Sequence, residues 1–255
     1  GVISGPSQPT NSPAPDLTAK LQDVDINFIR NNDYYDDRGD IEGIFNCGGS
    51  TYPSWEGCDA NDDTFYDWEK TDALATTIRN GHFNWFMRLG GEWQNADPTH
   101  DFKGPQNTTQ EDNWIIAAKK MAHRYEADYT YLNIWTEYPG DNFWDRSNSS
   151  FNTFWVKAYK SIKNDFPTKY VGGPGFSGFL TKEIMAGDTD NAATTFLTKL
   201  FREGVRPDWI GWHLFSVDPA EYQQAAAAYR NLLDATGPFS DMVWKTAQPF
   251  ADTEL

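Results

Sequence analysis

The chain has 255 residues, of which 39% are hydrophobic and 16% aromatic, and its formal net charge at pH 7 is −16. This length predicts one large domain, and the negative charge argues against nucleic acids and anionic membranes as partners, because both attract basic patches. Eleven Trp and twelve Tyr supply flat faces of the kind that stack on sugars or nucleobases, and the acidic balance favours sugars. We therefore expect a carbohydrate ligand, with at least half of the aromatic rings filling the core.

The start of the chain differs in composition from the rest. Residues 1–16 contain four Pro and several Ser, which is typical of an extended lead-in or the tail of a linker. The chain does not begin with a charged-then-apolar signal, so we expect its start to be a processed end. No stretch is apolar enough to span a bilayer, so we expect no membrane insertion.

Strand-like and helix-like segments alternate after this lead-in. Residues 24–30 are predicted to form a strand that ends at Arg30, and residues 67–81 a helix closed by an Asn-Gly pair. A second strand is expected at 82–93, where the apolar run meets two glycines.

The two cysteines, Cys47 and Cys58, lie in a stretch that is rich in Gly, Pro and Ser and contains no His. Two thiols cannot complete a zinc site by themselves, so a disulfide is the preferred interpretation. A disulfide implies an oxidising compartment, and we expect a secreted, extracellular protein. Asn107 and Asn148 each begin a glycosylation sequon, which agrees with secretion.

The middle of the chain continues the alternation. Thr108 and Glu111 fit a capping box at the start of a helix whose apolar residues recur at helical spacing. Strands are expected at 129–137 and 168–175, and a helical stripe at 151–162 separates them.

The last third of the chain has the same organisation. A strand is predicted at 207–216, followed by Asp218 and Pro219 as the cap and first turn of a helix that reaches Leu233. The segment 243–255 is predicted to be a final strand.

Apolar strands that alternate with helices indicate a parallel sheet with crossover helices. A closed barrel and an open doubly wound sheet both fit this pattern. The phosphate-cradling motifs of the open-sheet class, GxGxxG and GxxxxGK[ST], are missing from the sequence. The sequence therefore predicts an α/β fold, a (β/α)8 TIM barrel, over residues 17–255.

In such a barrel the chemistry lies where strands end and loops begin. The candidate residues at the predicted strand ends are Arg30, Glu92, Trp93, Glu137, His213 and Glu254. Two glutamates on strands far apart in sequence can face each other across the barrel mouth. That arrangement suits glycoside hydrolysis, in which one carboxylic acid protonates the leaving oxygen and the other carboxylate attacks or stabilises the anomeric carbon.

Structural roles compete with this interpretation at several positions. Arg30 could instead pair with Asp36 or Asp37, and His213 could be a hydrogen-bonded core histidine. Glu92 and Trp93 could form a sugar subsite or a polar loop entry. No metal site is expected, because the aspartates at 33–40 lack the spacing of a calcium loop.

Three linked stretches carry a family resemblance. They are "DNWIIAAKKMAHRYEADYTYLNIWTEYPGDNFW", "FWVKAYKSIKNDFPTKYVGGP" and "WIGWHLFSVDP". In this order and spacing they resemble glycoside hydrolase family 39, which belongs to a clan of retaining (β/α)8-barrel glycosidases. The resemblance extends from about Asp25 to the last residue.

The resemblance implies a role for each matching residue. Glu137 would be the general acid/base at the end of the fourth strand, and Glu254 the nucleophile at the end of the seventh. Arg30 would lie near the nucleophile, where a cation favours its ionised form. The substrate-binding residues would be Arg30, Asn32, Glu92, Trp93, Trp135, Thr136, Tyr138, His213 and Phe215. No cofactor is expected.

The chain departs from the family pattern at three of these positions. Thr136 stands where the family has an Asn that hydrogen-bonds the sugar, and Phe215 stands where it has a Tyr whose hydroxyl supports the nucleophile. Asn32 replaces a frequent His. The first two changes remove polar contacts that strengthen in the transition state, so the rate or the substrate is expected to differ.

Two further expectations follow from the resemblance. If Glu254 ends the seventh strand, the eighth strand lies beyond residue 255. The rival interpretations are a catalytically impaired carbohydrate-binding barrel and an endo-acting glycanase of the same clan.

Overall fold

The computed structural model describes residues 2–3, 17–31, 41–45, 58–91, 104–140 and 143–255. They form two compact units. The first unit comprises Gly1–Asn133 and Asp165–Lys169, and the second comprises Ile134–Asn164 and Tyr170–Leu255. The predictions for Asn32, Cys47, Glu92, Trp93, the aspartates at 33–40 and most of the lead-in lie outside the described residues.

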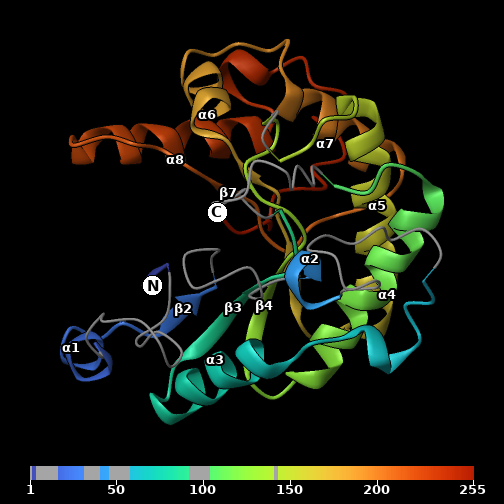
Figure 1. Ribbon diagram of the computed structural model, residues 1–255. Coiled ribbons are helices and arrows are strands. Elements are labelled where there is room, and N and C mark those ends of the chain that lie inside the picture. The colour runs from blue at the N-terminus through green and yellow to red at the C-terminus, as the bar shows by residue number, and fades with distance from the viewer. Residues whose placement is uncertain (1, 4–16, 32–40, 46–57, 92–103, 141–142) are drawn as a thin grey trace. The chain divides into compact units, whose positions relative to one another are not determined.

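Parallel strands form the sheet of the first unit. Its strands are β1 (Val2–Ile3), β2 (Phe28–Arg30), β3 (Asn84–Arg88) and β4 (Tyr129–Asn133). They pair in chain order, and Figure 1 shows β2, β3 and β4 side by side. The predicted strands are present but shorter. Residues 24–27 are not in β2, because Asp25 has φ +54° and the amide of Ile26 still donates to Leu21 at the end of α1 (Thr18–Asp23).

Helices α3 (Glu69–Asn80) and α4 (Thr108–Arg124) lie close to their predicted positions. The capping box predicted for α4 is wrong. Asn107 is the N-cap, and its side-chain oxygen accepts a hydrogen bond of 3.0 Å from the amide of Gln110. The helix buries the apolar face that the spacing predicted, which includes Trp114, Ala118 and Met121. The first unit also contains the short helices α2 (Ile41–Ile44) and η2 (Asp63–Phe65).

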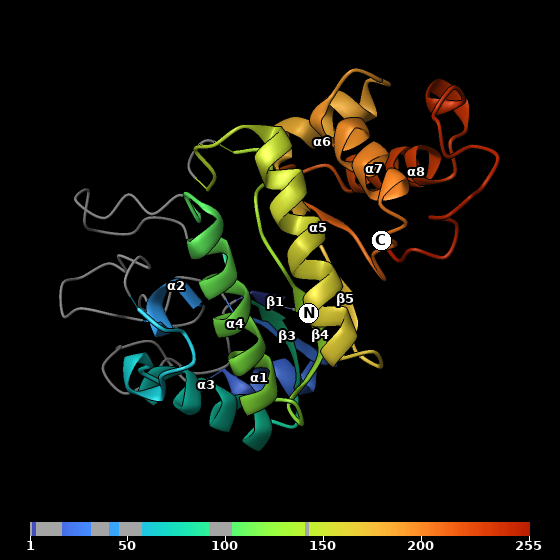
Figure 2. The same cartoon turned by 90° about the vertical axis from the view of Figure 1, so that its right-hand side faces the viewer.

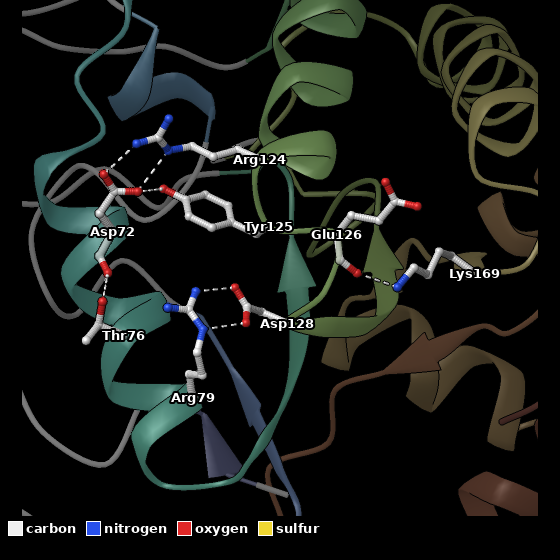
Figure 3. A network of polar contacts seen from close by, with 8 residues as sticks. All are labelled: Asp72, Thr76, Arg79, Arg124, Tyr125, Glu126, Asp128 and Lys169. Atoms are coloured by element: carbon white, nitrogen blue, oxygen red, sulfur yellow. Dashed lines mark hydrogen bonds and ion pairs between the residues drawn. The ribbon is translucent and has the colours of Figure 1, made fainter.

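A polar network joins α3 to the end of α4 and to the chain that follows it (Figure 3). Arg124 donates to both carboxyl oxygens of Asp72 at 2.8 and 2.7 Å, and the hydroxyl of Tyr125 donates to the same carboxylate at 2.8 Å. Arg79 makes a second two-bond contact, with Asp128, at 2.9 and 2.7 Å. Both contacts are bidentate, a geometry that fixes the angle between the partners.

The second unit contains several short parallel segments that lie side by side, and we call them together the wall. Residues 134–138 lie beside β5 (Tyr170–Gly172) and β6 (Gly175–Phe176), with amide-to-carbonyl bonds from Ile134 to Gly172 and from Gly175 to Trp135. Strand β6 pairs with β7 (Gly211–Trp212), and Trp209 pairs with Glu254. The strands predicted at 168–175 and 207–216 are thus present only in part.

The helices of this unit are α5 (Asn148–Asp165), α6 (Gly178–Met185), α7 (Ala192–Arg202) and α8 (Pro219–Leu233), and α6 packs against α8 (Figure 2). The last residue of α5 belongs to the first unit. The start of α8 is as predicted, because Asp218 accepts from the amide of Ala220 at 2.9 Å and Pro219 opens the helix.

The strand predicted at 243–255 is wrong. After η3 (Gly237–Phe239) the chain runs through successive turns, in which the amides of Lys245, Ala247 and Gln248 bond to nearby carbonyls. Gln248 has φ +45°, which no strand residue adopts. Within this segment Glu254 is the residue that pairs with the wall, through Trp209.

No helix among the described ranges has both the length and the apolar character needed to span a membrane.

Candidate active site

Glu137 ends the first segment of the second unit's wall in an unusual backbone conformation. Its φ is +54°, a left-handed value that costs a residue with a side chain about 1 to 2 kcal/mol. Regular strand alternation would place Trp135 and Tyr138 on opposite faces. Both rings instead contact Phe151 of α5, at centroid distances of 6.4 and 3.9 Å. The left-handed residue interrupts the alternation, and its own side chain stays 21% exposed.

His213 meets Glu137 at this position. Its ring nitrogen Nδ1 contacts the carboxyl oxygen Oε1 of Glu137, and its side chain is 26% exposed. The backbone fixes His213 as well, because its amide donates to the carbonyl of Phe176 at 2.8 Å. An imidazole N–H can donate a hydrogen bond to a carboxylate oxygen, and an unprotonated ring nitrogen can accept one from a carboxylic acid. The structure thus brings together two residues that the sequence singled out separately.

Gly175 lies next to His213 and Thr136. A Cβ atom at Gly175 would lie 3.2 Å from Nε2 of His213 and 3.3 Å from the hydroxyl oxygen of Thr136. Both distances are tighter than ordinary van der Waals contact, so the absent side chain gives the ring and the hydroxyl their room. Thr136 itself is buried, with 3% of its surface exposed. Sequence reasoning missed Gly175, and the signal was the third glycine of "VGGPG".

A cavity of about 480 Å³ opens beside Glu137. Its lining includes Glu137, Pro139, Ser177, Phe179, Lys182 and Phe215. The two phenylalanine rings are unusually open, with Phe179 75% exposed and Phe215 86% exposed. Phe179 and Lys182 were not found from the sequence. They belong to α6, a helix that begins directly after a strand end.

Trp135 and Tyr138, for which the resemblance implied substrate binding, lie in the core, and that role stays a prediction. Each is 1% exposed, because the ring of Trp135 packs edge-on against Trp144 and Phe154, and Tyr138 stacks on Phe151. Trp144 is buried by the same cluster. These rings support the segment that carries Glu137 from behind.

Glu254 belongs to the same wall and is separated from the segment of Glu137 by β6 and β7. Its amide donates to Asp208 and its carbonyl accepts from Ile210, both at 2.9 Å, and its side chain is exposed. It pairs with Trp209, two residues before Gly211, and Gly211 is in register with Gly175. The backbone of Glu254 is therefore held in the sheet even though the preceding segment is not a strand.

Two arginines end adjacent strands of the first unit. Arg30 ends β2 and Arg88 ends β3, where Arg88 is 1% exposed. The side chain of Asn31 fixes this edge. Its Nδ2 donates to the backbone carbonyl of Arg88 at 2.8 Å, and its Oδ1 accepts from the backbone amide of Arg88 at 2.6 Å. Burial lowers the pKa of Arg30 to about 10, so the guanidinium remains charged at neutral pH. Arg88 was not singled out from the sequence, and the proximity of Arg30 to Glu254 stays a prediction.

The predicted modification sites occupy different settings. Asn107 caps α4 through its side chain, whereas Asn148 is exposed at the first turn of α5. Glycosylation at either position stays a prediction, as does the pairing of Cys58 with Cys47. Across the described ranges, no group of three or more His, Cys, Asp or Glu side chains is arranged to hold a metal ion.

Solved structures share the fold of this chain. A glucosidase from Croceicoccus marinus superposes with a TM-score of 0.74 at 18% identity, covering 100% of this chain and 50% of that one. A monomeric beta-xylosidase from Caulobacter crescentus CB15 has a TM-score of 0.60 at 18% identity, with 87% and 45% covered. A GH10 xylanase from Thermobacillus composti has a TM-score of 0.54 at 18% identity, with 85% and 60% covered.

These similarities confirm the predicted fold class. The chain is an α/β protein with parallel strands, a partial (β/α)8 barrel of the kind found in glycosidases. It spans about half the length of the first two of these structures. No family model matches the sequence, and no curated protein does. The resemblance to family 39 therefore stays a prediction.

Proposed function

We propose that this chain carries the catalytic residues of a retaining glycoside hydrolase that cleaves glycosidic bonds in oligo- or polysaccharides by double displacement. The observation that carries the proposal is the contact between Glu137 and His213 at the rim of a cavity with exposed aromatic rings. The fold shared with a glucosidase, a beta-xylosidase and a xylanase supports it.

Glu137 is proposed as the general acid/base. Its carboxyl group protonates the leaving oxygen in the first step and then removes a proton from the water that attacks in the second. His213 is proposed as a positioning residue, because its Nδ1 contacts one of the two carboxyl oxygens of Glu137, Oε1. Both side chains are partly exposed, so water can reach them.

Glu254 is proposed as the nucleophile, with Arg30 near it. In a retaining enzyme the two carboxyl groups lie about 5 to 5.5 Å apart. The register agrees with such a role, because Glu254 stands in the same wall as Glu137, separated from it by β6 and β7. Its side chain is exposed. Asn32, Glu92 and Trp93 are proposed to bind substrate on the strength of the family resemblance alone.

A carbohydrate-binding barrel without turnover is the second candidate. Two observations favour it: Thr136 is buried where a sugar-binding Asn is expected, and Phe215 has no hydroxyl to support a nucleophile. An endo-acting glycanase is a further candidate within the enzyme class, and the sizes of the products released from a long polymer separate it from an exo-acting glycosidase.

A panel of aryl glycosides and polysaccharides tests the proposal. Glu137→Gln should abolish cleavage of substrates with poor leaving groups and spare activated ones, since only the former need an acid. Glu221→Gln, which changes a half-buried glutamate at the first turn of α8, is the matched control. NMR of the first product should show the anomeric configuration of the substrate. Binding of sugar without any release would support the non-catalytic barrel, and inverted product would overturn double displacement.

A further inference from the structure

The cavity beside Glu137 offers unusually little to a hydrated sugar. Pro139, Phe179 and Phe215 contribute apolar surface, and Gly140 and Gly178 contribute no side chain. A pocket that binds a sugar ring by its hydroxyl groups needs several polar partners placed around it.

Ser177, a polar member of this lining, is already engaged. Its hydroxyl oxygen accepts from the amide of Leu180 at 3.4 Å as the N-cap of α6, and the residue is 8% exposed. The remaining polar side chains of the lining are Glu137 and Lys182. The cavity thus combines one carboxyl group and one ammonium group with an otherwise apolar surface.

Phe179 and Phe215 are exposed to a degree that is rare for phenylalanine, at 75% and 86%. The ring of Phe215 lies over the backbone of Gly178, since a Cβ atom there would be 3.6 Å from its Cδ2 atom. Gly178 is the residue next to Phe179, so the two rings border the same stretch of the cavity. Two open rings beside a proposed proton donor form a surface that an aromatic or apolar group can cover.

The chemistry at Glu137 assigns this cavity to one side of the scissile bond. A general acid gives its proton to the oxygen that departs, so the group attached to that oxygen lies against the acid. The bond between the anomeric carbon and this oxygen breaks, the oxygen takes the proton of Glu137, and the proposed nucleophile Glu254 takes the anomeric carbon. This inference rests on the proposed function of the same site.

We propose that the cavity holds the leaving group, and that Phe179 and Phe215 select an aromatic, phenol-type leaving group over a second sugar. The sugar whose bond is cleaved then binds on the far side of Glu137. The preferred substrates are then glycosides of phenols, which narrows the oligo- or polysaccharides of the proposed function, and the departing product is a phenol.

Substrates that share one sugar and differ in the leaving group test this proposal. The set consists of an aryl glycoside, a disaccharide and the glycosyl fluoride, whose leaving atom is too small to reach the two rings. Wild-type kcat/KM should be higher for the aryl glycoside than for the disaccharide. Phe179→Ala and Phe215→Ala should lower kcat/KM for the aryl glycoside about tenfold each and leave the fluoride unchanged.

Tyr170→Ala is the matched control, because Tyr170 is an exposed ring at the opposite, amino end of β5. It should leave both rates unchanged. An equal fall on the aryl glycoside and the fluoride would overturn the proposal, since the rings would then contact the sugar that is cleaved. No change on either substrate would overturn it as well. In both cases the hydrolase function itself would stand.

Binding separates failure of this inference from failure of the proposed function. If no glycoside is cleaved, the hydrolase proposal fails, and saturation-transfer NMR with a phenyl glycoside still examines the cavity. The aromatic protons of the ligand should receive saturation from the wild-type protein and lose it in Phe179→Ala. Saturation that is the same in both proteins would overturn the aromatic site.

Discussion

His213 contacts the carboxyl group of Glu137 across 76 residues of sequence, because β6 separates their backbones by a single strand. The contact depends on parallel pairing, which brings the carboxyl ends of the two segments to the same edge of the wall. It also gives Glu137 a partner that orients one of its oxygens.

His213→Ala should lower kcat on a substrate with a poor leaving group about 10- to 100-fold, because a misplaced acid transfers its proton inefficiently. His213→Gln keeps a hydrogen-bonding group and should recover part of the loss. The measurement is kcat/KM against pH for the wild type and both variants. A pH profile of unchanged shape and height in His213→Ala would show that the contact has no part in the reaction.

Gly175→Ala should impair activity more than stability. The added Cβ atom would meet Nε2 of His213 at 3.2 Å and the hydroxyl of Thr136 at 3.3 Å, so the ring that contacts Glu137 must shift. Gly204→Ala is the informative control, because Gly204 has φ +62° and no atom within 4 Å of a new Cβ. That variant should lose about 1 kcal/mol of stability through backbone strain and keep its activity. Kinetics and thermal unfolding of both variants decide; the same behaviour in both would remove the steric argument.

Tyr138→Phe should leave KM unchanged, and Tyr138→Ala should lower the free energy of unfolding by about 3 to 5 kcal/mol. The reason is that Tyr138 is 1% exposed and stacks on Phe151 at 3.9 Å, so its ring supports the core. Chemical denaturation and steady-state kinetics give the two quantities. A raised KM in Tyr138→Phe would return the hydroxyl to the substrate-binding residues.

Asp72 should stabilise the first unit in a pH-dependent way. Hydrogen bonds from Arg124, and then from Tyr125, hold the pKa of the Asp72 carboxyl below its usual range. The stabilisation is therefore fully present above the usual pKa of an aspartate, about 3.9, and is lost as the pH falls through the lower pKa of the folded state. Because the side chains of Asp72 and Arg124 are 44% and 42% exposed, solvent limits this stabilisation to less than about 1 kcal/mol.

Thermal unfolding of Asp72→Asn from neutral pH to below pH 4 examines this expectation. The curves of the variant and the wild type should differ at neutral pH, converge in acid, and approach each other in high salt. Asp241→Asn changes an exposed aspartate of the second unit and serves as the control. A constant difference between Asp72→Asn and the wild type at all pH values would contradict the assignment.

The disulfide expected between Cys47 and Cys58 should block both thiols. Labelling of the unfolded protein with maleimide should therefore need prior reduction. Reduction should also lower the midpoint of unfolding, because an open loop gains freedom in the unfolded chain, worth typically about 2 to 4 kcal/mol. Two reactive thiols without reductant would remove the argument for an oxidising compartment and, with it, the main support for secretion.

Short sequence motifs were sufficient to predict elements whose conformation depends only on neighbouring residues. Asp218 and Pro219 open α8 as predicted, since a cap needs only its own turn of helix. The pattern of predicted strands also placed Glu137 and His213 at the ends of strands, where the chemistry of a barrel lies. The turns at 243–253 were not recognised, because the sequence of this segment does not reveal the backbone bonds that close them.

The sequence could not predict which side chains around Glu137 are buried and which are exposed. The family resemblance implied that Trp135 and Tyr138 bind the substrate, and both lie in the core. Period-two alternation would place them on opposite faces, and it cannot anticipate the left-handed residue between them. Phe179 was missed for a different reason. Its importance comes from exposure beside a carboxyl group, and exposure is a property of the folded chain.

Because the backbone of Glu137 is left-handed, the residues that would be most stable at position 137 differ from the residue that the proposed activity requires. Glycine and asparagine adopt φ +54° at less cost than glutamate does, and neither has a carboxyl group to donate a proton. A library randomised at position 137 and screened for heat resistance alone should therefore converge on these two residues. Screened for sugar release, the same library should return to glutamate.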